Sequence, residues 1–259
     1  MAGPHIARYT FAVEHARGRR VLDAGSGAGY GAAILAEGGA ARVVGVDLDP
    51  EMVAQARQRF VHRAIEFLVD DCQELSRAGG PFDLVCNFEN IEHLPRPEQF
   101  LEAAARVLER DGVLIVSTPD RAATPPFVEG RPRNPFHVHE WYREEFAAIL
   151  APWFEEVEMR AQVESLAVGR RTEAVAALRR GLMWVNLPVS FLWRKFSRGA
   201  SGRRSWRELE GLAAGGAGDY PIVPLGLVGV FGRSWCHVAI CRGPRRLRGD
   251  GTGWNAPPG

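Results

Sequence analysis

The feature that most constrains the fold of this chain is a regular alternation of short apolar runs with helical stretches. The apolar runs predict strands at residues 20–25, 42–47, 65–70, 82–88 and 112–118. The stretches between them predict helices at residues 29–38, 50–60 and 97–109. Short strands with little polar alternation, separated by helices, are typical of a parallel sheet that is covered on both faces. Right-handed crossovers then give a doubly wound α/β sheet that binds ligands at the carboxyl ends of its strands.

The later part of the chain follows this alternation less closely. A helix at about 142–151 and strands at 154–163 and 235–242 complete a predicted sheet of seven strands, but residues 164–232 lack the pattern. A stretch of this length inside a compact sheet is usually an insertion or a lid. We therefore expect one domain made of residues 1–163 and 233–243, a basic and apolar insertion or lid at 164–232, and a disordered tail at 244–259.

Charge is distributed unevenly along the chain. From residue 160 onward there are 16 Lys and Arg and 6 Asp and Glu, whereas the first 159 residues contain 16 and 25. A basic half is typical of proteins that contact acidic substrates, nucleic acid or a membrane surface, although solvated arginines give the same count. Residues 182–196 combine tryptophan, phenylalanine and leucine with Arg194 and Lys195. This pattern is compatible with peripheral membrane contact or with a buried lid helix.

Composition excludes several classes of protein. With 46% hydrophobic and 24% charged residues, the chain does not resemble a disordered protein. No apolar run approaches the roughly 20 residues that span a bilayer, and the amino-terminal segment lacks the apolar core of a secretory signal. The four cysteines form no CxxC pair or disulfide framework, which suits a reducing compartment. We therefore expect a soluble, cytoplasmic protein.

A glycine-rich turn, in the sequence VLDAGSGAGYG, follows the first predicted strand. Gly25, Gly27 and Gly29 permit positive φ angles and a close approach of the backbone to a ligand. The G-x-G-x-x-G pattern of dinucleotide-binding folds fails here, because Tyr30 occupies its last position. Asp23 would repel a pyrophosphate but suits a ligand that presents an ammonium group. The turn therefore favours such a ligand over a dinucleotide.

Acidic residues follow the next two predicted strands. Asp47 ends the second strand, 22 residues after Gly25, where a carboxylate can accept hydrogen bonds from both hydroxyls of a ribose. Asp71 and Cys72 follow the third strand, where a side chain can bind an adenine amino group. The three strand ends together predict a site for an adenosine that carries an ammonium group.

Five segments, in this order along the chain, resemble those of the class I S-adenosylmethionine-dependent methyltransferases: DAGSGAG, VVGVDLD, VDDCQEL, FDLVCNFENIEHL and LERDGVLIVSTP. The resemblance covers about residues 5–163 and the last strand, and it implies a Rossmann-like fold, methyltransferase activity and S-adenosylmethionine as cofactor. It implies that Asp23 and the glycine loop hold the methionine moiety and that an amino-terminal helix brings Arg8 to its carboxylate, although a surface arginine is an equal alternative. The implied cofactor-binding residues are Arg8, Asp23, Gly25, Ser26, Gly27, Gly29, Asp47, Leu48, Asp71, Cys72 and Asn87.

The fourth predicted strand leads into a cluster of titratable residues, Glu89-Asn-Ile-Glu92-His93. If a helical turn begins there, Glu89 faces Glu92 at i+3 and His93 at i+4. Two carboxylates and an imidazole repel or compete unless they are protonated or bridged by a cation. Mixed oxygen and nitrogen ligands suit Mg²⁺ or Mn²⁺. The cluster therefore predicts a divalent metal site, with metal-free base catalysis and a purely structural role as alternatives.

The E-x-x-E-H pattern also resembles the metal-binding motif of the small-RNA 2′-O-methyltransferases and of the ubiquinone-biosynthesis O-methyltransferases. The former add a later histidine in H-x-x-E-W, which matches His137-Val-His-Glu-Trp141 here. The resemblance implies a catalytic role for His93 and His139, with His139 as a candidate general base. The implied metal ligands are Glu89, Glu92, His93 and His137.

A bound cation would chelate two vicinal oxygens and lower the pKa of the attacking hydroxyl. This predicts O-methylation of a vicinal-diol or catechol-like small molecule or glycan, and the segments HIARYTFA and NPFH loosely resemble methyltransferases that modify sugars. The alternatives are an RNA or lipid-linked substrate recruited by the basic insertion, a metal-free N- or C-methyltransferase that uses His93 or His139, and a non-catalytic S-adenosylmethionine-binding module. The oligomeric state stays open.

Overall fold

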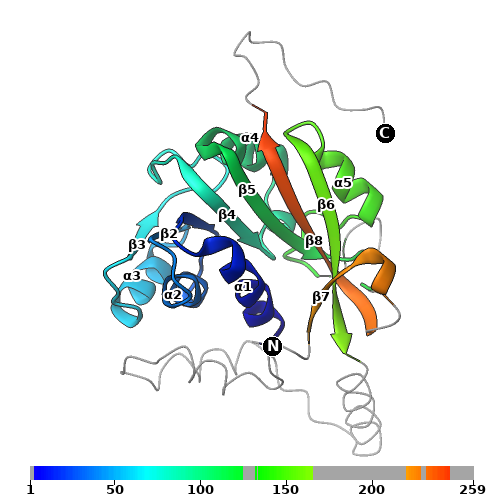
Figure 1. The fold of residues 1–259 in the computed structure, drawn as a ribbon, viewed down its shortest axis with the longest axis horizontal. Helices are drawn as coiled ribbons and strands as arrows, with labels where there is room; N and C mark the ends of the chain where they lie inside the picture. Colours follow the sequence, from blue (N-terminus) through cyan, green and yellow to red (C-terminus); the bar gives the residue numbers. More distant parts are fainter. Residues whose placement is uncertain (1–2, 125–131, 133, 166–219, 229–231, 246–259) are drawn as a thin grey trace, which may run out of the picture.

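The computed structural model describes residues 3–124, 132, 134–165, 220–228 and 232–245 (Figure 1). In this part of the chain the strands are β1 Arg20–Ala24, β2 Arg42–Asp47, β3 Ile65–Val69, β4 Phe82–Phe88, β5 Leu108–Pro119, β6 Phe154–Ser165, β7 Ile222–Pro224 and β8 Gly232–Pro244. The helices are α1 Gly3–Ala16, α2 Tyr30–Glu37, α3 Pro50–Arg59, α4 Pro97–Val107 and α5 Arg143–Leu150, with short 3-10 helices η1 Ile91–His93 and η3 Leu225–Leu227.

The described strands form one sheet of eight, in the order β3-β2-β1-β4-β5-β8-β6-β7. Strands β1 to β5 are parallel, β8 runs antiparallel between β5 and β6, and β7 pairs antiparallel with β6. This confirms the predicted Rossmann-like, doubly wound α/β class. The sheet has one strand more than the seven predicted, because Ile222–Pro224 pairs with Arg160–Gln162 at the edge. A strand of three residues is too short to give a recognisable apolar run.

The sheet is buried on both faces, which explains why its strands show little polar alternation. Val21 packs with residues of α1, α2 and α3 on one face, and the next residue, Leu22, packs with residues of α4 and α5 on the other (Figure 1). Burying one such aliphatic side chain contributes about 1.5–3 kcal/mol. Local signals set the helix starts: at α3, Pro50 is the first residue and Asp49 Oδ1 accepts a hydrogen bond from Glu51 N at 2.8 Å.

Several expectations concern residues that lie outside the described part of the chain. They are most of the insertion or lid (166–219 and 229–231), the apolar and basic stretch at 182–196, and the tail from 246. Among the described helices, none has both the length and the apolar character that a membrane crossing requires.

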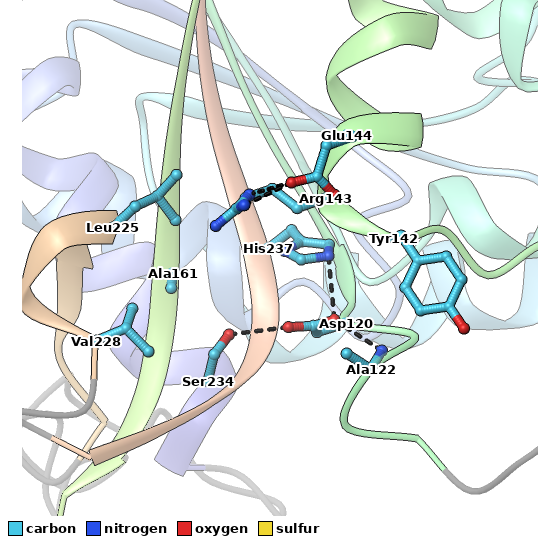
Figure 2. Close-up of a pocket in the computed structure, with 10 residues that line it drawn as sticks. All are labelled: Asp120, Ala122, Tyr142, Arg143, Glu144, Ala161, Leu225, Val228, Ser234 and His237. Atoms are coloured by element: carbon cyan, nitrogen blue, oxygen red, sulfur yellow. Dashed lines mark hydrogen bonds and ion pairs between the residues drawn. The ribbon is translucent and has the colours of Figure 1, made fainter.

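The loops that follow β1 to β5 meet at one edge of the sheet, and the strand order reverses there between β1 and β4. Open α/β sheets bind their ligands at this position. Further along the same edge, a cavity of about 290 Å³ lies beside the end of β5 and the first half of β8 (Figure 2). The carboxyl edge thus offers two neighbouring places for ligands.

Candidate functional site

The glycine loop lies at the end of β1, against the end of β2. The amides of Gly25 and Ser26 both donate to Val46 O, at 2.9 and 2.8 Å. Gly25 has a φ of 78°, and a Cβ there would lie 2.6 Å from Cγ of Asn90. Gly27 has a φ of 50°, but no described atom lies within 4 Å of the place where its Cβ would be. The loop is therefore packed tightly on one side and open on the other, as a ligand-binding loop requires.

Asp23 is fully buried below this loop. Its Oδ1 accepts a hydrogen bond from the Tyr9 hydroxyl at 2.9 Å, whereas its Oδ2 has no hydrogen-bond partner among the described residues. Burial is the main cause that raises the pKa of Asp23 to about 7, and the nearby carboxylate of Asp47 adds to it. A buried carboxylate with one unpaired oxygen is matched by a cationic donor. Asp23 therefore fits an ammonium group, as the sequence indicated.

The other expected cofactor residues surround the loop. Asp47 Oδ2 accepts a hydrogen bond from Gly27 N at 2.7 Å, and Leu48 beside it is 68% exposed, so an apolar side chain stands free next to the loop. Asp71 and Cys72 follow β3, and Cys72 Sγ lies 3.5 Å from Nδ2 of Asn90. The ends of the three strands thus lie close to one another.

Asn87 and Asn90 link the cofactor side to the end of β4. Asn87 is fully buried and its Nδ2 donates to Ala24 O at 2.9 Å, which ties β4 to the start of the glycine loop. Asn90 was not predicted, yet its side chain lies between Gly25 and Cys72. The one sequence feature that could have indicated a role for Asn90 is its position just after the fourth strand.

Arg8 is fully buried at the carboxyl edge, so the surface position considered from the sequence is excluded. Its Nη1 donates to Gln162 Oε1 at 2.6 Å and lies 3.7 Å from Glu89 Oε1. Although burial opposes the charge, Glu89 and other neighbours raise the pKa of Arg8. Its Nε and Nη2 have no hydrogen-bond partner among the described residues. Arg8 therefore keeps two donors for an anionic group.

Glu89 is directed toward Arg8 by an unusual backbone. Its φ is 50°, and the 3-10 helix begins only at Ile91, so Glu89 does not share a helical turn with Glu92 and His93. The Glu89 carboxylate contacts Cys236 Sγ at 3.3 Å as well as Arg8. The expected i to i+3 geometry is therefore wrong, because the chain enters the turn two residues later than the pattern suggested.

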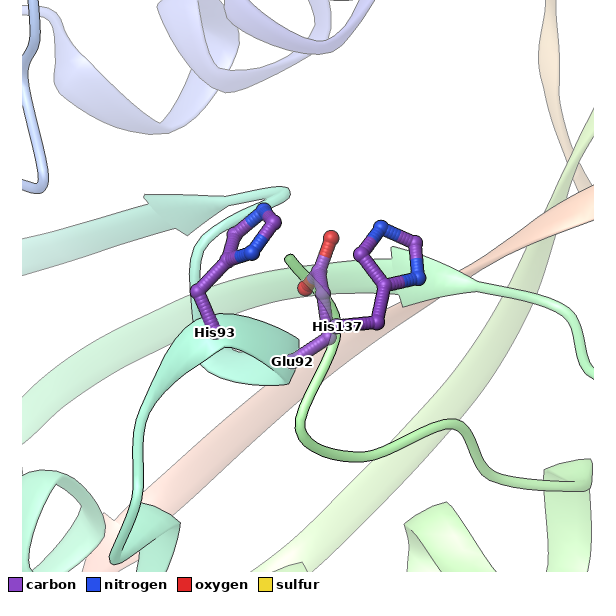
Figure 3. Close-up of side chains that lie close together, drawn as sticks. All are labelled: Glu92, His93 and His137. Carbon is purple, nitrogen blue, oxygen red and sulfur yellow. The ribbon is translucent and has the colours of Figure 1, made fainter. Parts of the chain in front are cut away.

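Glu92, His93 and His137 form a group whose candidate ligand atoms all lie within 4.8 Å of one another (Figure 3). The two imidazoles flank the carboxylate, with ring centroids 5.0 Å apart. The segment that carries His137 is fixed to Glu92 itself, since Val138 N and His139 N donate to Glu92 O at 2.8 and 3.1 Å. Three of the four expected metal ligands are thus together, and Glu89 is not in the group.

Both imidazoles have their Nδ1 atom occupied. His93 Nδ1 lies 2.7 Å from Phe136 O, and a carbonyl can only accept, so this nitrogen carries the proton. His137 Nδ1 lies 2.8 Å from Oε1 of Glu140, whose Oε2 accepts from the Thr124 hydroxyl at 2.8 Å. This tautomer leaves the lone pair of each ring on Nε2, as in metal-binding histidines. Glu140 was missed as a functional residue, although it is the acid of the H-x-x-E-W segment.

Glu92 lacks the partners that a buried carboxylate needs. It is 1% exposed, and neither carboxylate oxygen has a hydrogen-bond partner of normal geometry among the described residues. Burial, together with the nearby charge of Glu89, raises the pKa of Glu92 well above its usual value. An unpaired buried carboxylate between two free imidazole nitrogens fits a divalent cation.

His139 lies apart from this group. Its ring stacks on that of Trp141, with centroids 5.2 Å apart and planes at 14°. Its Nε2 is buried and has no hydrogen-bond partner in the described part of the chain. Its role as a general base stays a prediction.

The comparisons with known proteins concern the domain as a whole and not the individual site residues. A family model described as a methyltransferase domain matches residues 22–116. A Mycolicibacterium smegmatis protein named "Probable S-adenosylmethionine-dependent methyltransferase" is 38% identical over 148 residues, which are 56% of this chain and 55% of that protein. The ubiquinone biosynthesis O-methyltransferase of Xanthomonas oryzae is 32% identical over 157 residues, covering 56% and 64%. The chain thus matches less than two thirds of the length of either relative.

Among solved structures, a chain from the complex between the Haloferax volcanii Trm112 methyltransferase activator and a methyltransferase superposes with a TM-score of 0.58. The match covers 95% of this chain and 92% of that chain at 18% identity, which supports the fold alone. Together with the mostly parallel sheet, this match shows that the chain has a Rossmann-like fold of the class I type.

Proposed function

We propose that this chain is an S-adenosylmethionine-dependent methyltransferase that methylates an acceptor oxygen beside a divalent cation held by Glu92, His93 and His137. One observation supports the metal above all others. Among the described residues, a buried carboxylate without a hydrogen-bond partner of normal geometry lies between two imidazoles whose Nδ1 atoms are already engaged. The same carboxylate in a metal-free enzyme would be left unpaired at considerable cost.

The cofactor supplies an activated methyl sulfonium when it is bound. The protein then has to hold the cofactor and align an acceptor oxygen with it. When the cofactor is bound, Asp23 would accept from its ammonium group, Asp47 from its ribose hydroxyls, and Asp71 with the Cys72 amide would hold its adenine. Asp47 already accepts a hydrogen bond from Gly27 N, so it would have to accept the ribose hydroxyls in addition.

A divalent cation such as Mg²⁺ or Mn²⁺ would lower the pKa of a coordinated hydroxyl. Such a site favours a vicinal-diol or catechol-like small molecule or glycan as acceptor. His139 is the candidate to receive the proton, because its buried Nε2 has no partner in the described part of the chain. The fully buried Arg8 supports the cofactor carboxylate or an anionic group of the acceptor with its two unpaired donors.

The proposal is tested by calorimetric titration of EDTA-stripped protein with Mn²⁺ in the presence of S-adenosylhomocysteine. We expect micromolar binding that is lost in His137→Ala and retained in His62→Ala, a matched variant at an exposed histidine outside the group. Glu89→Gln separates the two arrangements, since it keeps Mn²⁺ binding if the three-residue group is the site. Absence of Mn²⁺ binding together with methyl transfer in EDTA would overturn the metal and favour base catalysis.

A further inference from the structure

The cavity beside β5 and β8 has one polar wall, which is built around Asp120 (Figure 2). Asp120 Oδ2 accepts from the Ser234 hydroxyl at 3.1 Å, and Oδ1 accepts from Ala122 N at 2.8 Å and lies 3.3 Å from His237 Nε2. Partial burial opposes the charge of Asp120, but the interactions with His237 and Ala122 lower its pKa overall. The wall is therefore a fixed, ionised carboxylate flanked by a hydroxyl and an imidazole.

Buried polar atoms on this wall are not fully used. His237 is 2% exposed, and neither of its ring nitrogens has a hydrogen-bond partner among the described residues, although Nε2 lies 3.3 Å from Asp120 Oδ1. Each ring nitrogen can therefore take part in a further hydrogen bond. Ser234 Oγ donates its proton to Asp120 and keeps its lone pairs. The wall can thus accept hydrogen bonds from a ligand that carries hydroxyl groups.

The opposite side of the cavity is apolar. Ala161, Leu225 and Val228 line it, whereas the ring of Tyr142, which is 45% exposed, lies on the other side of Asp120 (Figure 2). The volume of about 290 Å³ lies at the lower limit of ligand pockets, which span roughly 300–1,000 Å³. A space of this size and polarity suits one ring with hydroxyl groups along one edge.

Charge at the cavity argues against an anionic ligand. The guanidinium of Arg143, which also lines the cavity, is paired with Glu144 at 2.5 Å. The unbalanced charge is then the carboxylate of Asp120, which repels carboxylates and phosphates.

The cavity and the group of Glu92, His93 and His137 are built from one short segment. Residues 137–144 provide His137 to the group and Tyr142 to the cavity. The turn after β5 joins them a second time, since it holds Asp120 in the cavity wall and Thr124 against Glu140, the partner of His137. The two places are therefore linked through the same two segments of the chain.

We propose that this cavity binds a neutral, hydroxylated ring of the acceptor, through Asp120, Ser234 and His237. That the ring belongs to the methyl acceptor rests on the proposed function, but binding of the ring needs neither the metal nor methyl transfer. Hydroxylated rings come from two sources, sugars and phenols, and both share the hydrogen-bond donors that this wall accepts.

The test is ligand-observed NMR on the full chain with S-adenosylhomocysteine and EDTA, so that no metal contributes. The probes are methyl glucopyranoside, catechol and, as an anionic ring, benzoate. We expect the sugar or the phenol to bind and benzoate to bind much more weakly. Ser234→Ala removes one hydrogen bond and should weaken binding roughly threefold to tenfold. Val228→Trp fills the cavity and should abolish binding.

Ser76→Ala is the matched control, because Ser76 Oγ also donates to an aspartate, Asp70, at 3.3 Å but lies outside the cavity. Val228→Trp keeps the test decisive if Ser234→Ala fails to fold. The proposal is overturned if neither hydroxylated ring binds, if benzoate binds as well as they do, or if binding survives Val228→Trp. Because metal is absent, these outcomes are distinct from a failure of the Mn²⁺ titration.

Discussion

The two halves of the carboxyl edge are built in different ways. On the cofactor side, the contacts join residues close in sequence or on adjacent strands, such as Gly27 N to Asp47 and Asp49 N to Asp47. On the acceptor side, they join distant parts of the chain, such as His93 to Phe136 and Asp120 to Ser234. The first half is set by motifs, whereas the second exists only once the sheet has formed.

Each half also buries a carboxylate, and the two differ in their partners. Asp23 has a hydrogen bond from the Tyr9 hydroxyl, and its pKa is raised to about 7. Glu92 has no hydrogen-bond partner of normal geometry among the described residues, and burial raises its pKa well above its usual value. The cofactor side is therefore nearly satisfied without ligand, whereas the acceptor side is strongly dependent on one.

The largest effect is expected for Glu92→Gln, which removes a proposed metal ligand on the acceptor side and leaves the contacts of the cofactor side unchanged. Loss of a Lewis acid that contributes several kcal/mol should lower turnover by roughly 1,000-fold. The affinity for S-adenosylhomocysteine should stay close to wild type, because Glu92 is absent from the loop contacts. Steady-state kinetics and calorimetry measure the two quantities. A parallel loss of cofactor affinity would show that the halves are not separate.

Asp23→Asn breaks the cofactor side alone. Losing a charged hydrogen-bond partner should weaken S-adenosylhomocysteine binding roughly 10- to 150-fold. Asparagine can still accept the bond from Tyr9 through its amide oxygen, so the fold has no reason to change. Mn²⁺ titration of the same variant should give the wild-type result, and a lost Mn²⁺ site would contradict the separation.

Glu140→Gln tests a residue that does not bind the metal itself but holds the ligand His137. Replacing the acceptor of the His137 Nδ1–H bond should weaken Mn²⁺ binding about 10- to 100-fold. Glu145→Gln is the matched control, since Glu145 Oε2 accepts from Tyr142 N at the start of α5 and lies 3.9 Å from Arg121 Nη1, away from the histidines. Equal losses in both variants would point to a general disturbance of the segment.

The smallest effect concerns stability without ligand. Because the pKa of Asp23 is about 7 in the folded protein and 3.8 in its reference state, ionisation opposes folding as pH rises from about 4 to 7. Asp23→Asn should therefore melt at least about 2 °C above wild type at pH 8, with a difference that shrinks toward pH 4. Thermal melts of both proteins at several pH values measure this, and a constant difference would count against the raised pKa.

The same contrast explains what the sequence could predict. The apolar runs gave β1 to β4 within one residue, and the glycine loop with Asp23 and Asp47 is local. The strand β5 begins four residues before the predicted run at 112–118, because Leu108–Asp111 continues directly from α4.

The pattern of apolar runs could not predict contacts between residues that lie far apart in the sequence. Nothing near Asp120 in the sequence indicates that it meets Ser234 and His237, because β8 reaches that edge only after pairing between β5 and β6. The direction of Glu89 was equally hidden, since it depends on a positive φ at a residue that is not glycine. His137 was found only because its spacing to Glu140 and Trp141 resembled a known motif.

Glu92 couples the group of Glu92, His93 and His137 to the cavity beside β5 and β8. Its carbonyl accepts the amides of Val138 and His139, while its carboxylate faces the histidines, so one residue anchors the segment 137–144 and also faces its ligand. A cation that orders segment 137–144 would reduce the conformational entropy that this segment still has to lose when an acceptor ring binds. Thermodynamic linkage then requires the reverse: the acceptor must tighten the cation by the same factor. Such positive cooperativity would make the pair bind in concert rather than in a fixed order.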